Sequence, residues 1–90
     1  MSDPPSSIDF TAFAFSLAQW ALIFMGLEPS PDGTEQAPNL DAARQNIDIL
    51  AMLEEKTRGN LTAEEREFVT KMLYTLRMSF VEVSKSQQAG

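Results

Sequence analysis

The chain contains no cysteine and no histidine. Without cysteine there is no disulfide framework, no thiol nucleophile and no thiolate metal site. Without histidine the chain lacks the side chain best suited to proton transfer near neutral pH and the commonest ligand of transition metals. We therefore expect no catalytic residue, no metal site and no bound cofactor, and we predict that the protein is not an enzyme.

Basic residues are also few. The 90 residues include seven Lys and Arg against thirteen Asp and Glu, which gives a net charge of −6. The seven are scattered from Arg44 to Lys85 and form no cluster. Because phosphate backbones are bound by clustered Lys and Arg, we expect no nucleic-acid partner.

Carboxylates remain as the possible acid–base groups. Neighbours such as Glu64 and Glu65 diverge by about 100° on a helix and therefore do not share a proton site. Two other carboxylates stand four residues before a basic residue, which predicts helical ion pairs of a structural kind; these pairs are Glu54–Arg58 and Glu67–Lys71. Asp48, one turn after Arg44, is the sharper candidate among the carboxylates, but a partly buried pair of these two is expected to be a structural or interface ion pair and only rarely a catalytic group.

No stretch alternates with period two over a useful length, so strands are not expected and the fold class is all-α. The chain should form one helical domain over residues 9–84, with helices at about 9–26, 40–58 and 63–84 and flexible tails at 1–8 and 85–90. The helix starts carry capping residues: Asp9 (or Ser7), Asn39, and Thr62 with Glu65 as a capping box.

The connections set the topology. Residues 28–38 hold three prolines and an Asp-Gly turn signal, which predicts a polar loop. The second link is only Gly59 to Thr62, so helices 40–58 and 63–84 should be antiparallel neighbours in a three-helix, hairpin-type bundle. Gly59 is expected at the C′ position of the second helix with a positive φ.

The most unusual segment is Phe10–Leu27, which carries no charge and five aromatic residues. On a helix these residues form three neighbouring sets. The first is an aromatic-rich stripe made of Phe10, Phe13, Leu17, Trp20, Phe24 and Leu27. Beside it lies a strip of small residues, Ala14, Ala18 and Ala21, and further round the helix lie Phe15, Leu22 and Ile23. The third helix has a second apolar set as well, made of Tyr74, Met78 and Val81. A neighbouring backbone can approach closely over the strip of small residues. A three-helix monomer covers about one face of each helix, so a further apolar face needs a cover.

Self-association is the expected cover, because an exposed apolar patch normally marks an interface. We predict a homo-oligomer, most simply a two-fold dimer with the first helix near the axis. The predicted interface residues are Phe15, Ala18, Leu22, Ile23, Met25, Tyr74, Met78 and Val81. The expected function is that of a non-enzymatic interaction or assembly module, and an unidentified protein partner is also possible.

Three alternatives remain open at this stage. The loop and termini of the chain can fold back over the first helix, or a small hydrophobic ligand can be carried or sensed between aromatic helix faces. The third alternative is peripheral membrane association through helix 9–26. Insertion across a membrane is disfavoured, because a spanning helix needs about 20 apolar residues and this run is shorter, with acidic flanks. The start of the chain lacks a basic region of the signal-peptide type, so a cytoplasmic location is expected.

Several sequence motifs resemble the bacterial domain-of-unknown-function family 1844. They are NL at 39–40, IDILAML at 47–53 and KTRGNLT at 56–62, together with IDFTAFAFSLAQWALIFMG upstream and LYTLRMSF at 73–80. The resemblance spans about residues 8–82. It implies a small, cytoplasmic, helical bacterial protein with no established activity, and it supplies no catalytic or ligand-binding residues.

Overall fold

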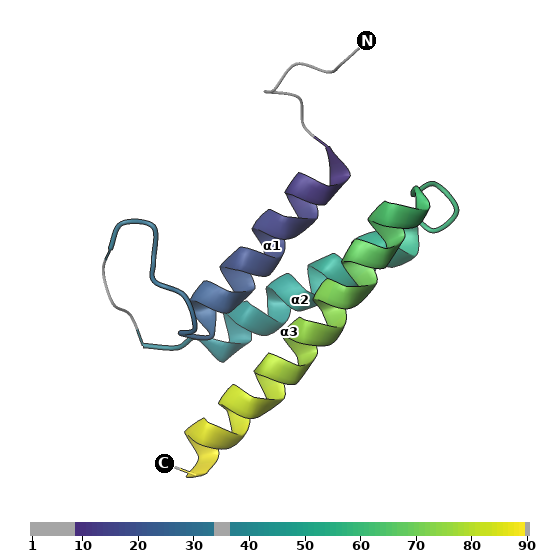
Figure 1. The fold of residues 1–90 in the computed structure, drawn as a ribbon. Coiled ribbons are helices and arrows are strands. Elements are labelled where there is room, and N and C mark those ends of the chain that lie inside the picture. The colour runs from purple at the N-terminus through teal and green to yellow at the C-terminus, as the bar shows by residue number, and fades with distance from the viewer. Residues whose placement is uncertain (1–8, 34–36, 90) are drawn as a thin grey trace.

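The computed structural model describes residues 9–33 and 37–89, which form three α-helices: α1 (Phe10–Phe24), α2 (Leu40–Lys56) and α3 (Ala63–Ala89). The all-α, three-helix prediction is confirmed, and the described ranges contain no strand. α1 and α3 run in the same direction and α2 runs opposite to both (Figure 1). Each helix contacts the other two. The predicted flexible tail at residues 1–8 and the alternative cap Ser7 lie outside the described residues.

The first two helices begin where the capping residues predict. The Asp9 carboxylate accepts a hydrogen bond of 2.7 Å from the Ala12 N–H, and the Asn39 side-chain oxygen accepts one of 3.1 Å from the Ala42 N–H. Each bond satisfies a backbone donor that has no partner inside its helix, which contributes about 1 kcal/mol to helix stability. Short polar side chains therefore fix both starts.

α1 ends at Phe24, two residues before the predicted end, in a Schellman motif. The Gly26 N–H donates to the Ile23 carbonyl at 3.0 Å and the Leu27 N–H donates to the Leu22 carbonyl at 2.9 Å. This pattern requires a left-handed residue at C′, and Gly26 has a φ of +83°. A Cβ on Gly26 would also lie only 3.2 Å from Pro38 Cγ, so glycine is needed here for space as well as for conformation.

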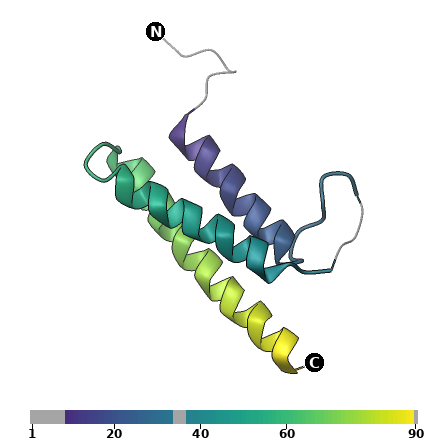
Figure 2. The ribbon, with the colours of Figure 1, turned by 180° about the vertical axis from the view of Figure 1, so that it is seen from behind.

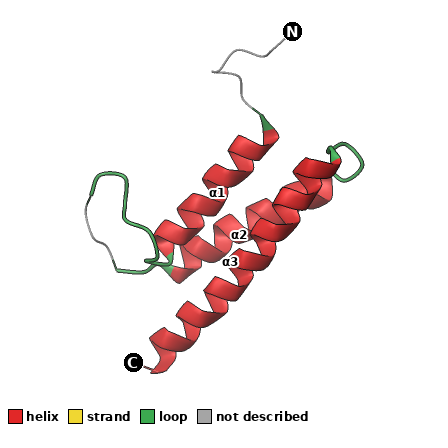
Figure 3. Cartoon of the chain, in the orientation of Figure 1, coloured by secondary structure: helices red, strands yellow, loops and turns green. Residues whose placement is uncertain are grey.

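The long connection between α1 and α2 returns to its starting point. The Asn39 N–H donates a hydrogen bond of 2.7 Å to the carbonyl of Phe24, the last residue of α1. Pro38 lies against Gly26 in the same place. The start of α2 is thus fixed to the end of α1, and the described part of the connection bulges to one side of the bundle (Figure 3).

The hairpin between α2 and α3 follows the predicted chemistry with one correction. α2 ends at Lys56 with Thr57 as C-cap, so Gly59 lies two residues beyond the cap and not at C′. Gly59 has the predicted positive φ, +91°, in a turn closed by the Asn60 N–H and the Thr57 carbonyl at 2.8 Å. The capping box is complete: Glu65 N–H donates to Thr62 Oγ1 at 3.1 Å, and Thr62 N–H donates to Glu65 Oε1 at 2.9 Å.

We expect Gly59→Ala to lower the free energy of unfolding by about 1–2 kcal/mol, because the left-handed conformation brings a Cβ too close to the following carbonyl oxygen. Apart from Gly59 itself and its two chain neighbours, no atom lies within 4 Å of a Cβ built at this position, so the cost comes from the local backbone alone. Gly59→Asn is the control, since asparagine tolerates this conformation better. Urea denaturation of both variants measures the difference; equal stability of all three proteins would place Gly59 in an unstrained turn.

The core is built around the small residues of α1. Ala14, Ala18 and Ala21 are buried, together with Met25, and pack with buried residues of the other helices; these are Ala43, Ile47 and Leu50 of α2 and Val69, Leu73 and Leu76 of α3. The close approach expected over the small residues is therefore confirmed, and the aromatic stripe is not the covered face of α1. Three of its members, Phe10, Leu17 and Phe24, flank the core, whereas Phe13 and Trp20 are exposed. Alanine lets the helix backbones approach closely, and large side chains at the centre of the contact would hold them apart.

α3 is longer than predicted. It spans 27 residues and ends at Ala89, so residues 85–89, expected in a flexible tail, are helical. Figures 1 and 2 both show its C-terminal part continuing past the ends of α1 and α2. No glycine or proline interrupts residues 63–89, so the helix has no sequence signal to stop at Ser84.

Candidate functional site

Large apolar side chains remain exposed on all three helices and the loop. They are Phe13, Phe15 and Trp20 of α1, Leu27 of the loop, Ile49 and Met52 of α2, and Tyr74, Met78 and Val81 of α3. Single exposed apolar residues are ordinary on a protein surface, but nine large ones among the described residues are many for a chain of this length. Two groups among them are compact enough to be considered as sites.

The predicted interface residues fall into three classes. Four are exposed, namely Phe15, Tyr74, Met78 and Val81. Leu22 and Ile23 are half-buried, and Leu22 packs against the core. Ala18 and Met25 are each only 1% exposed inside their own chain, so the native surface does not present them to another molecule. The helical period alone does not determine which face of α1 points inward.

The exposed surface of α1 is aromatic and uncharged. Phe13 and Trp20 are seven residues apart and share a face, and the Trp20 and Phe24 rings lie 5.8 Å apart at 32°. Trp20 also lines an open hollow of about 330 Å³ together with Ile23, Pro29 and Pro31. The hydroxyl of Ser16, one of the few polar groups here, donates to the Phe13 carbonyl at 2.7 Å, so it is satisfied within its own helix. The whole helix carries no charged residue.

The second group lies on α3 and is called here the α3 strip: Tyr74, Met78 and Val81. These side chains are 67%, 50% and 47% exposed, respectively. They occupy the side of α3 opposite the buried Val69, Leu73 and Leu76, because their positions differ from those by about half a helical turn. The strip is thus directed away from the bundle.

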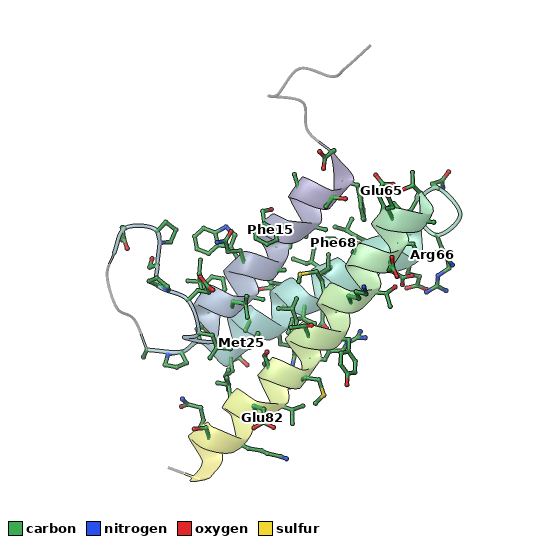
Figure 4. The ribbon with its side chains drawn as sticks, viewed as in Figure 1. Phe15, Met25, Glu65, Arg66, Phe68 and Glu82 are labelled. Carbon is green, nitrogen blue, oxygen red and sulfur yellow. The ribbon has the colours of Figure 1, made fainter. Side chains whose placement is uncertain are left out.

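A third feature is an open hollow of about 630 Å³ between the N-terminal ends of α1 and α3. Phe15 and Phe68 contribute apolar walls, and Glu65 lies at the border (Figure 4). Asp9 and Glu64 add two further carboxylates to its lining. Asp9 and Glu65 already serve as caps of the two helices. An open, acid-bordered hollow does not suit an apolar ligand, and among residues 9–33 and 37–89 no three acidic side chains are grouped to hold a metal ion.

The charged groups form local ion pairs. The predicted pairs are confirmed: Arg58 Nη2 lies 2.9 Å from Glu54 Oε1, and Lys71 Nζ lies 3.9 Å from Glu67 Oε2. The hydrogen bond from Arg58 to Glu54, reinforced by the carboxylate charge, raises the pKa of the Arg58 guanidinium. Both pairs lie on the surface, where such pairs contribute little to stability.

The ion pair considered for Arg44 and Asp48 does not form. Both side chains are exposed, and within the part of the chain that the structure describes they form no ion pair. Arg44 instead places its Cζ 5.9 Å from the centroid of the Phe80 ring of α3. The guanidinium is attracted to the face of an aromatic ring that lies on another helix, so the i,i+4 spacing alone misled the prediction.

The comparison with protein families matches residues 7–82 to the family described as "Domain of unknown function (DUF1844)". The chain belongs to the DUF1844 family. The resemblance inferred from the KTRGNLT and IDILAML motifs is therefore confirmed, over nearly the same residues. Searches of curated proteins and of solved structures found no match to this DUF1844 chain.

The apolar character of α1 in this DUF1844 chain does not extend far enough to cross a bilayer. Of the helices within the described residues, none combines the length and the apolar character that crossing a membrane requires. α1, the most apolar of them, is 15 residues long.

Proposed function

We propose that this DUF1844 chain is a non-enzymatic, homo-oligomeric assembly module, with a dimer as the simplest form. The observation that carries the proposal is the presence of large exposed apolar side chains on the outer sides of α1 and α3. Of the predicted interface residues, Phe15, Tyr74, Met78 and Val81 are exposed and available for this role, and the half-buried Ile23 is partly available. Ala18 and Met25 are left out because they are core residues.

The burial of these side chains supplies a driving force. Complete burial of a large apolar side chain contributes about 1.5–3 kcal/mol, and Phe15, Met78 and Val81 are each about half exposed in the single chain. Covering the exposed half of each therefore contributes about 0.7–1.5 kcal/mol per side chain before the entropy cost of association. A symmetric contact doubles the number of side chains covered, which favours a two-fold arrangement.

The roles of the carboxylates support the non-enzymatic part of the proposal. The carboxylates of Asp9 and Glu65, near the hollow between α1 and α3, cap helices, and Glu54 and Glu67 are bound to basic neighbours. A general acid or base needs a substrate-sized pocket and a tuned pKa. The hollow beside Asp9 and Glu65 is open and does not enclose a substrate, which supports a non-enzymatic role.

Sedimentation equilibrium of the purified chain tests this proposal. We expect a mass of at least twice the 10.0 kDa of the single chain at micromolar concentration, with dissociation on dilution. The measurement should be repeated at low and high salt, since an apolar contact persists at high salt. A mass of 10.0 kDa at every concentration would contradict the proposal.

A further inference from the structure

The α3 strip follows the spacing of a coiled-coil seam. Lys71, Tyr74, Met78, Val81 and Lys85 succeed one another at intervals of three, four, three and four residues. This spacing corresponds to the a and d positions of a heptad, the positions that face a partner helix in a two-stranded coiled coil. Apolar residues occupy the three central positions, and a lysine stands at each end, Lys71 and Lys85. The apolar part of the seam is therefore short and limited to residues 74–81.

Charged residues border the α3 strip in a specific order. Arg77 immediately precedes Met78 and occupies a g position, and Glu82 immediately follows Val81 and occupies an e position. Both side chains are exposed, and neither forms an ion pair with another described residue. In a parallel two-stranded coil, a g residue faces the e residue five positions later on the other helix. Arg77 and Glu82 have this separation in the chain.

We propose that α3 pairs in parallel with α3 of a second copy of this chain, with the α3 strip at the two-fold axis and Arg77 of each copy paired with Glu82 of the other. This inference rests on the proposed self-association and gives it a surface and an orientation. The α1 surface has no such border, because α1 carries no charged residue that selects a partner or a direction.

Orientation follows from the symmetry. A parallel two-fold axis brings the Arg77 flank of one helix against the Glu82 flank of the other, so both ion pairs form at once. An antiparallel two-fold axis brings each flank against the same flank of the other copy, so Arg77 faces the flank that holds Arg77 and neither ion pair forms. The charge pattern therefore favours the parallel pair.

The bundle leaves room for this pairing. The α3 strip is opposite the core side of α3, so a second helix approaches without displacing α1 or α2. Figure 4 shows Glu82 on the part of α3 that continues past the other two helices. Lys71 stands at one end of the seam, and its Nζ lies 3.9 Å from Glu67 Oε2 on its own helix. This pairing reduces the repulsion between the Lys71 side chains of the two copies.

Matched glutamate variants test the surface. We expect Met78→Glu to weaken dimerisation at least hundredfold, because it places two carboxylates at the axis of an apolar contact. Met52→Glu is the control: Met52 is a methionine of α2 with a similar exposure, 44% against 50%, and lies outside the strip. Circular dichroism should show the same helical content in both variants, and sedimentation equilibrium gives the dissociation constants.

A charge exchange tests the orientation. We expect Arg77→Glu and Glu82→Arg, each alone, to weaken the dimer about tenfold, because both interchain ion pairs become like-charge contacts. The double variant should dimerise like the native chain. An equimolar mixture of the two single variants should form a heterodimer, because the introduced glutamate of one chain faces the introduced arginine of the other and the second pair is native.

Cysteine substitutions give an independent readout, since the chain has no cysteine of its own. In the parallel pair Tyr74 and Val81 each face their own counterpart, so Tyr74→Cys and Val81→Cys should both give disulfide-linked dimers on mild oxidation. An antiparallel axis allows at most one of them to do so. Met52→Cys should remain unlinked at the same concentration.

The outcomes separate the two proposals. A native chain that is monomeric at all concentrations overturns both. A native oligomer that tolerates Met78→Glu as well as Met52→Glu overturns the α3 pairing and leaves self-association in place. A third outcome is that Met78→Glu dissociates the oligomer, the mixture of Arg77→Glu and Glu82→Arg chains does not dimerise, and only one cysteine variant cross-links. In that case the α3 surfaces pair but the parallel orientation is wrong.

Discussion

Replacing Ala18 with leucine is expected to lower the free energy of unfolding by about 1–3 kcal/mol. Ala18 is 1% exposed and lies in the middle of the row of alanines through which α1 contacts the other helices. A leucine adds carbon atoms where the close contact leaves no space, so α1 must move outward. That movement weakens the contacts of Ala14 and Ala21 as well.

Ala12→Leu is the matched control for this variant. Ala12 lies on the same helix, earlier in the chain, and is exposed, so the added atoms meet solvent. We expect its stability to stay within about 0.5 kcal/mol of the native chain. Urea denaturation at one protein concentration measures both, because association would otherwise shift the midpoint. If the two variants are equally stable, the alanine row is not the contact surface of α1.

Leu50→Ala is expected to cost about 2–5 kcal/mol. Leu50 is fully buried on α2, and its truncation leaves a cavity in the core cluster that also contains Val69 and Leu76. Small domains are stable by only about 5–15 kcal/mol, so this change removes a large share of the total. The buried apolar residues of the described ranges belong to this single cluster, so no second core compensates for the loss.

The neighbouring residue provides the comparison. Ile49 is adjacent in sequence, similar in volume and 37% exposed, so Ile49→Ala removes as many atoms from a partly solvated position. We expect Ile49→Ala to lower the free energy of unfolding by less than half as much as Leu50→Ala does. Thermal unfolding followed by circular dichroism ranks the two, and a larger loss for Ile49→Ala would mean that α2 packs with a different face.

The local structure of this chain was predictable because its signals are local. Thr62 and Glu65 stand three residues apart and cap one helix, and the spacing alone identifies both partners. Asn39 and Gly59 are similar: a helix start needs a side-chain acceptor, and this turn needs a positive φ. Each of these requirements is met within a few residues of the chain, so no knowledge of the tertiary structure was necessary.

The inward face of α1 was not predictable in the same way. Its apolar residues surround the helix, so hydrophobicity gives no preferred direction. The choice depends on how closely α2 and α3 can approach, which favours the alanine row over Phe13 and Trp20. The contact between Arg44 and Phe80 was missed for a related reason, because it joins two helices whose facing residues only the assembled bundle defines.

Because of the hydrogen bond from the Asn39 N–H to the Phe24 carbonyl, the stability of the helix packing depends little on the loop between α1 and α2. Since the two ends of the loop meet at this bond and at the contact of Gly26 with Pro38, the packing of the helices does not depend on how many residues lie between them. Doubling the length of a closed loop costs only about 0.6 kcal/mol in closure entropy. We therefore expect the connection between α1 and α2 to accept insertions at a small cost in stability, without a change in the angle between the helices.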